Sequence, residues 1–324
     1  MRVCFHSLAL MFIFLFLGSC SRVPEHEVVL YTSVDEPFAR PIVDEFQKRS
    51  GIHVTLVTDT EAAKSVGLAE RLRAEKDRPR ADVFWGNEVF NTIRLAEEGV
   101  LARSDLPEAG RVPSRFKDAH GKWAANALRL RMLVSRPDVH IKNLDDLIDP
   151  KLKDKIAIAR PTAGTTGGHL AAIYLLWGES RANKFFQSLH DNGVKLLGGN
   201  SAVADAVARG TLAAGLTDND DATAAQDEGG KLNALPPDQE TIGTLAIPAT
   251  VSLVTGAPHE NAGKQLADYL LSPEVAKKLV DVKFSYATPD APPANVRLMN
   301  VDYAEVAKIM PAAIRSAMII LEGR

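Results

Sequence analysis

The first hundred residues alternate between short β-prone runs and segments with helical periodicity. The β-prone runs cover residues 28–31, 52–57 and 81–85, and the segment after the first run carries apolar side chains every three or four residues. This β-α-β-α-β order predicts a mainly parallel sheet with helices on both faces. Ligands of such sheets lie at the carboxyl ends of the strands. The residues that follow 31 and 85 are therefore the first candidates for a binding site.

The chain is long enough for two domains. It has 324 residues, of which 46% are hydrophobic and 24% charged, as is usual for globular proteins. No Pro- or Gly-rich linker divides it, so we expect two lobes that the chain crosses several times. The net charge of −3 excludes a general basic surface for nucleic acid. Two cysteines exclude a disulfide scaffold and a four-cysteine zinc site.

The first twenty residues predict an export signal. Arg2 precedes an apolar run over residues 8–17, which is short for a membrane-spanning helix and typical of a signal-peptide core. Small residues then lead to Cys20, an order that resembles the lipobox of bacterial lipoproteins. The resemblance implies a signal peptide over 1–19, a lipid on Cys20 and a tether over 20–27. The mature protein would then lie outside the cytoplasm, anchored in the periplasm or at the cell membrane; a plain secretory signal is the alternative.

Five stretches of the chain carry a wider resemblance. In order, they are VVLYTSVDEPFARPIVDEFQKRSGIHV, RADVFWGNEVF, ARPTAGTTGGHLAAI, NSAVADAVARGTLAAGLTDNDDA and KQLADYLLSPEVAKKLV. Together they resemble the ferric-iron-type periplasmic solute-binding proteins of ABC importers. The resemblance runs from about residue 28 to residue 289.

This resemblance implies an α/β protein with the two-lobe type II periplasmic-binding-protein fold. Each lobe would be a mostly parallel sheet flanked by helices, with the ligand in the cleft between the lobes. We expect the first lobe over 28–127 plus 246–285, and the second over 128–245 plus 286–324. The resemblance also implies a monomer without catalysis, which passes a small ligand to an ABC permease in the inner membrane.

An acidic loop late in the middle region is the first candidate site. Asp218, Asp220 and Asp221 repel one another and are tolerated best in solvent or beside a cation. The iron binders of the family carry tyrosines at the last two positions, a histidine at Asp35 and a glutamate near Asn87. These departures put ferric-phenolate ligation in doubt. Carboxylate and amide oxygens suit calcium, magnesium, manganese or an ammonium group.

We therefore expect Asp35, Asp220 and Asp221 to be metal ligands, with Asn87 and Asp218 beside them in the ligand site. The alternative is a polar loop that caps the following helix through Asp218 or Asp220.

Two helix starts and two arginines suit an anion. Thr165 and Thr166 lie in a glycine-rich loop before a helix, and Ser201 opens a later helix. Arg129 and Arg131 share one face of a predicted strand, so they need an anionic ligand or the acidic loop as partner. The resemblance implies that both helix starts and Arg129 hold phosphate or carbonate beside a metal. Helix capping and surface salt bridges are the alternatives.

Two ligand types remain open: a metal cation with a companion anion, and a small zwitterion or anion such as an aminoalkyl phosphonate. We expect no catalytic cofactor. The order Asp218-Asn219-Asp220 is similar to the start of haloacid-dehalogenase phosphatases, but it lies two thirds along the chain and continues differently. A phosphatase is therefore a remote alternative. A sensor that hands the solute to a receptor is a further one.

Overall fold

A computed structural model describes residues 26–59, 67–162 and 164–324. The predicted signal peptide and Cys20 lie outside the described residues. The strands are β1 (Glu27–Thr32), β2 (His53–Thr58), β3 (Val83–Gly86), β4 (Leu101–Ala102), β5 (Ala124–Ser135), β6 (Ile156–Ala159), β7 (Lys195–Leu197), β8 (Ala214–Asp218), β9 (Asn233–Leu235) and β10 (Ala246–Val254). The helices are α1 (Glu36–Ser50), α2 (Gly67–Ala74), α3 (Val89–Glu97), α4 (Gly164–Asp191), α5 (Asn200–Ala208), α6 (Asn219–Asp227), α7 (Glu260–Leu270), α8 (Pro273–Asp281) and α9 (Tyr303–Leu321).

Proline and glycine mark the ends and the bend of two helices. Pro37 lies in the first turn of α1, and Gly51 ends this helix with φ at 72°, a conformation that glycine adopts without strain. Helix α4 changes direction at Gly178, whose φ is 75°. The sequence predicts two helical segments on either side of this glycine, and the structure has both.

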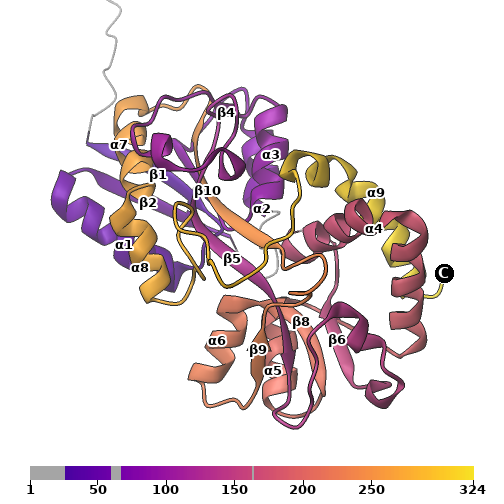
Figure 1. Ribbon diagram of the computed structural model, residues 1–324. Coiled ribbons are helices and arrows are strands. Elements are labelled where there is room, and N and C mark those ends of the chain that lie inside the picture. Colours follow the sequence, from indigo (N-terminus) through magenta and orange to yellow (C-terminus); the bar gives the residue numbers. More distant parts are fainter. Residues whose placement is uncertain (1–25, 60–66, 163) are drawn as a thin grey trace, which may run out of the picture.

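The first lobe is built on three parallel strands in the order β2-β1-β3. Strand β10 pairs antiparallel with β3 on one side and with β5 on the other. Helices α1, α7 and α8 lie on one face of this sheet, and α2 and α3 lie on the other (Figure 1). The carboxyl ends of β1 and β3 therefore point toward the second lobe, with Thr32 paired to Trp85.

Strand β5 passes from one lobe into the other. Its residues up to Leu130 pair with β10, and its residues from Arg131 onward pair antiparallel with β8. The second lobe continues through β8, β6 and β7, which are mutually parallel, while β9 pairs with the end of β5. Both sheets are thus mixed: a parallel set of three strands is completed by antiparallel strands that run between the lobes. Every residue of β5 is buried.

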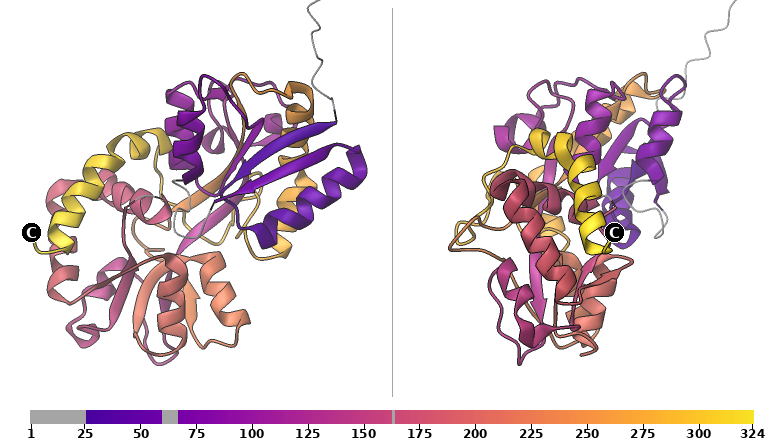
Figure 2. Two further views of the ribbon diagram at one scale, coloured as in Figure 1. Left: turned by 180° about the vertical axis from the view of Figure 1, so that it is seen from behind. Right: turned by 90° about the vertical axis from the view of Figure 1, so that its right-hand side faces the viewer.

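Helices α4 and α9 pack along each other at the side of both lobes (Figure 2). Val306 and Met310 of α9 belong to the apolar core of the first lobe, whereas Ala317 and Leu321 belong to that of the second. The sequence-based assignment of residues 286–324 to the second lobe is a proposal, and α9 contributes to both cores.

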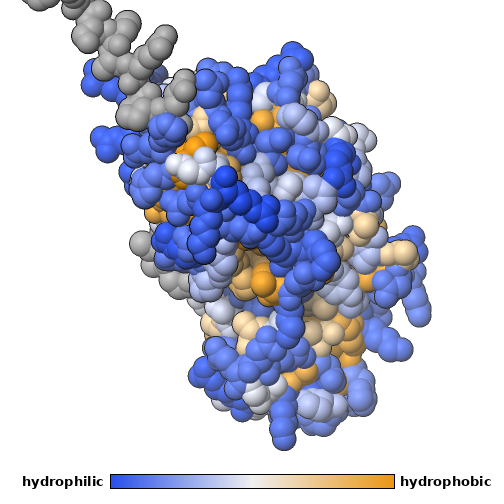
Figure 3. Space-filling model, turned by 90° about the vertical axis from the view of Figure 1, so that its left-hand side faces the viewer, coloured by the Kyte–Doolittle hydropathy of each residue, from blue (hydrophilic) through white to orange (hydrophobic). Residues whose placement is uncertain are grey.

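Polar side chains cover most of the exterior, as the hydrophilic colours of Figure 3 show for one face, with apolar residues visible near its middle. None of the described helices combines the length and the apolar character needed to cross a membrane.

Candidate functional site

Polar side chains gather where β5 crosses between the lobes. Arg129 and Arg131 are both buried on this strand, and Arg131 lies opposite Asp218 in the pairing of β5 with β8. Asp218 is the last residue of β8 and directly precedes α6. The site thus forms at the carboxyl end of a strand, the position at which α/β sheets bind ligands.

The carboxylate of Asp218 is the centre of a hydrogen-bonded cluster. It accepts hydrogen bonds from two guanidinium groups, one hydroxyl and one amide. The donors are Arg131 Nη1 at 2.6 Å, Thr165 Oγ1 at 2.8 Å, Arg129 Nη2 at 3.0 Å and Asn200 Nδ2 at 3.0 Å. These donors come from β5, α4 and α5, so one carboxylate joins three elements.

Asp218 does not cap the helix that it precedes. It occupies the N-cap position of α6, yet its side chain makes no hydrogen bond to the backbone of that helix. Aspartate is among the residues that most favour capping. Here, however, the carboxylate binds the two arginines instead of the backbone N–H groups of α6. Burial alone would raise the pKa of Asp218, but Arg131 and Arg129 lower it below its ordinary value.

Arg129 connects this cluster to Asp220 and to the first lobe. Its Nη2 and Nε lie 2.7 and 3.1 Å from Oδ1 of Asp220, and its Nη1 donates to the carbonyl of Asn87 at 3.3 Å. The guanidinium also lies over the ring of Phe284, 5.4 Å from the centroid. Burial lowers the pKa of Arg129. The surrounding carboxylates, of which Asp220 contributes most, outweigh burial, so the pKa lies above its ordinary value.

Three carboxylates lie together at this point. Oxygens of Asp218, Asp220 and Asp221 are all within 4.8 Å of one another. They face two guanidinium groups, so the cluster keeps one excess negative charge when all members are ionised. Burial raises the pKa of Asp220, and the charge of Asp218 adds to this rise, while Arg129 opposes it. The arrangement therefore favours an additional positive charge.

Asp35 is not a member of this carboxylate cluster. It follows β1 and lines a hollow of about 400 Å³ at the carboxyl ends of β1 and β2, together with Thr58 and Asp59. Asn87 follows β3, where its backbone N–H donates to Ser33 Oγ at 2.9 Å and its side-chain oxygen accepts from the same hydroxyl at 3.1 Å. The first lobe thus offers a separate polar edge at the ends of its strands.

The helix starts contribute unequally. Thr165 binds Asp218 as described, and Thr166 donates to Asn200 Oδ1 at 3.2 Å. Ser201 is exposed; its neighbour Asn200 supplies the contacts, accepting from Arg131 Nη1 at 3.0 Å. Sequence reasoning missed Asn200, although an amide that opens a helix after two glycines was a signal for it.

Three further polar residues lie here to which the sequence analysis assigns no site role. Asn219 accepts from the backbone N–H of Leu130 at 2.8 Å and fixes α6 against β5. Glu88 is buried and accepts from the first backbone N–H groups of α3, while burial raises its pKa. His169 is fully buried and its ring nitrogens have no hydrogen-bond partner among the described residues. Burial and then Arg131 lower the pKa of His169 to about 3, so the ring is neutral.

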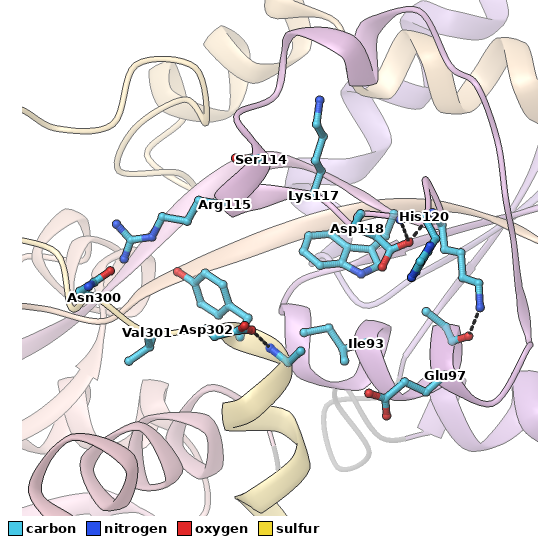
Figure 4. Close-up of a pocket in the computed structure, with 16 residues that line it drawn as sticks. Ile93, Glu97, Ser114, Arg115, Lys117, Asp118, His120, Asn300, Val301 and Asp302 are labelled. Carbon is cyan, nitrogen blue, oxygen red and sulfur yellow. Dashed lines mark hydrogen bonds between the residues drawn. The ribbon is translucent and has the colours of Figure 1, made fainter.

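A hollow of about 810 Å³ lies elsewhere, between α3, the loop around residue 118 and the start of α9 (Figure 4). At least two of its charged groups serve the fold. Lys122 Nζ donates to the carbonyl of Ala96 at 2.7 Å, and Asp302 accepts from the first turn of α9 at 2.8 Å. Because it gathers no buried charge, we favour the arginine–carboxylate cluster as the site.

Two α/β lobes joined by crossing strands, with polar side chains from both at the junction, define a two-lobe binding protein. The sequence matches the bacterial extracellular solute-binding proteins over residues 28–284, and the chain belongs to this family. The Bordetella ferric binding protein has the same fold, with a TM-score of 0.74 and 26% identity over 91% of this chain and 98% of that one. The fold is therefore that of the type II periplasmic binding proteins, as the sequence resemblance predicts.

Two curated relatives are similar to this chain in sequence. The Fe(3+)-binding periplasmic protein of Serratia marcescens is 26% identical over 204 residues, which are 61% of this chain and 59% of that protein. A Salmonella typhimurium periplasmic protein, provisionally named for binding 2-aminoethylphosphonate, is 26% identical over 249 residues, 74% of this chain and 71% of that one. The alignments span about three fifths of the first curated relatives.

Proposed function

We propose that this chain is the solute-binding component of an ABC importer and that it captures a metal cation between its two lobes. The observation that carries the proposal is the approach of three carboxylates, Asp218, Asp220 and Asp221, to within 4.8 Å of one another beside Arg129. A cation placed against these oxygens would offset their mutual repulsion. The Serratia relative, which is named for binding Fe(3+), supports a metal as cargo.

The donor set points to a cation that accepts oxygen ligands. Carboxylate oxygens are hard ligands suited to manganese, magnesium or calcium, as well as to ferric iron. Asp220 and Asp221 stand where the iron binders of the family carry tyrosines, and Asp35 would approach from the first lobe. Ligands on both lobes would favour the closed state, because the cation binds that state more tightly than the open one.

A zwitterion with a phosphonate group is the second candidate. The relative named for 2-aminoethylphosphonate binding supports it, as do the N-termini of α4 and α5, where Thr165 and Asn200 lie side by side at 2.9 Å. Its ammonium group would then take the place of the metal beside Asp220 and Asp221.

The remaining parts of the proposal concern the cell. We propose that the protein acts without catalysis, as a monomer, and hands its solute to a permease in the inner membrane. A lipid on Cys20 would anchor it outside the cytoplasm. Membership of a solute-binding family supports transport as the role.

Native mass spectrometry with elemental analysis tests the cargo on protein purified from its own cell envelope. We expect a bound metal, and we expect Asp220→Ala with Asp221→Ala to abolish metal binding while leaving the circular dichroism spectrum unchanged. Asp227→Ala is the matched control, because Asp227 lies at the exposed end of the same helix. Unchanged metal affinity in the double variant would refute the acidic loop as the site. An organic mass without metal would favour the zwitterion.

A further inference from the structure

The position of one carboxylate bears on which solutes this site accepts. The donors suited to an anion beside the acidic loop are Arg129, Arg131, Thr165 and Asn200, and each already donates to Asp218. Their distances of 2.6–3.0 Å are those of charge-assisted hydrogen bonds made at full strength. Asp218 therefore occupies the point at which one donor atom from each of these four side chains converges. Nε and Nη2 of Arg131 are buried and have no hydrogen-bond partner among the described residues.

We infer that Asp218 is a built-in anion, which fills the anion subsite of this protein and makes an external phosphate, phosphonate or carbonate unnecessary. The inference rests on the proposed function, since it concerns the same site. If Asp218 takes the place of the anion, the protein selects a cation that binds without a dissolved companion anion. A solute with its own phosphonate group would be rejected, because that group would compete with a carboxylate that is covalently held in place.

Two observations support the inference. Asp218 leaves its N-cap position on α6 unused, so its side chain serves the donors and not the local backbone. Arg131 and Asp218 are both nearly inaccessible to solvent, at 0% and 1% exposure, so a dissolved anion does not reach this ion pair.

The charge balance also disfavours a further anion. Two guanidinium groups meet three carboxylates here. A further anion would add to an excess of negative charge within a buried cluster, where charges interact strongly. A cation would reduce that excess.

The first test uses the wild-type protein and inorganic phosphate alone. We expect no saturable heat in isothermal titration calorimetry and no broadening of the phosphate signal in ³¹P NMR at millimolar concentrations. Metal binding should be unchanged after carbonate and phosphate are removed from the buffer. Saturable phosphate binding to the wild type, or metal binding that requires either anion, would overturn the inference. This measurement needs no variant to fold.

The second test removes the Asp218 carboxylate from the anion subsite. In Asp218→Ala the four donors would face an empty volume the size of a carboxylate, so formate should bind there. We expect formate to raise the melting temperature by about 5 °C at a hundredfold excess over its dissociation constant. The wild type and Asp227→Ala, which removes an exposed carboxylate from α6, should not respond. A folded Asp218→Ala protein that responds no more than Asp227→Ala would contradict the inference.

The two proposals fail in different ways. If Asp220→Ala with Asp221→Ala retains full metal affinity, the proposed cation site is wrong whatever phosphate does. If the double variant loses the metal and the wild type nevertheless binds phosphate, only the built-in anion is refuted.

Discussion

Gly168 of α4 lies directly against the ring of Phe90 in α3. A Cβ atom at position 168 would lie 1.9 Å from Cε2 of that ring. The neighbouring Gly167 is similarly close to α9, where an added Cβ would lie 2.9 Å from the terminal methyl of Met310. The pair of glycines thus brings the start of α4, with Thr165, against the first lobe. The sequence predicts a glycine-rich loop before the helix, but both glycines lie within α4, where they allow the helices to pack closely.

Gly168→Ala should destabilise the protein by about 1–3 kcal/mol, because the extra methyl overpacks a buried contact. The free energy of unfolding in urea measures the effect. Gly198→Ala is the control, since an added Cβ there has no neighbour within 4 Å. Combining Gly168→Ala with Phe90→Leu should cost less than the sum of the two single changes; strict additivity would show that the glycine and the ring do not compete for space.

Thr165→Val should cost about 1–2 kcal/mol of unfolding free energy, because it removes a buried donor to Asp218 while keeping the shape of the side chain. The same variant should raise the pKa of Asp218, since the hydroxyl helps to lower it. Unfolding in urea at several pH values reports both effects. Thr211→Val, at an exposed hydroxyl that donates to the carbonyl of Ala206, should change stability by less. Equal losses would mean that the Thr165 hydroxyl has no special role.

Asp82→Ala should destabilise the first lobe by about 3 kcal/mol, because several buried donors would lose a charged acceptor at once. The Asp82 carboxylate accepts from the backbone N–H of Val29 at 2.7 Å, and from the backbone and ring of His259 at 2.7 and 2.9 Å. Chemical unfolding measures the loss. Asp281→Ala, which removes an exposed carboxylate, is the control. A loss no larger than that of Asp281→Ala would contradict this prediction.

Asp238 should make stability depend on pH. Burial raises the pKa of this carboxyl from 3.8 to about 6. Folding therefore favours its neutral form, so the stabilisation is complete below pH 3.8 and is lost as pH rises through about 6. A shift of this size corresponds to about 3 kcal/mol. Asp238→Asn should remove most of this dependence, because the asparagine amide does not ionise. Asparagine also tolerates the local φ of 58°, so the backbone should be preserved.

Unfolding free energies at pH 4 and pH 7 check the Asp238 prediction. The wild type and Asp238→Asn should be close at pH 4, and the variant should be the more stable at pH 7. Glu240→Gln changes an exposed group in the same loop and should follow the wild type. Parallel pH profiles for wild type and Asp238→Asn would be the contrary result.

The sequence predicts the fold class because the relevant signals are local. The alternation of strands and helices is specified by signals that act within a few residues. These signals are the period-two and helical patterns, together with Pro37 and Gly51. The insertion of β10 between β3 and β5 is different. No pattern within residues 246–254 reveals their neighbours, since pairing depends on contacts more than a hundred residues away along the chain.

The candidate site also has parts that local sequence signals predict and parts that depend on tertiary contacts. Strand periodicity places Arg129 and Arg131 on one face, and the structure directs both toward the acidic loop. The choice of Asn200 instead of Ser201 depends on the rotation of α5 against β8, which Thr217 fixes through a 2.9 Å bond to the carbonyl of Asn200. The local preference of Asp218 is helix capping, and a tertiary cluster overrides it. Such overrides are not visible in a sequence window.

The place of β10 also has a consequence for the order of folding. The first sheet cannot close until residues 246–254 are available to fill the gap between β3 and β5. Until then both of those strands present an unpaired edge, and the pairing that closes the sheet joins segments far apart in the chain. Contacts of this kind slow folding. The first lobe therefore reaches its native state only after most of the polypeptide has been made.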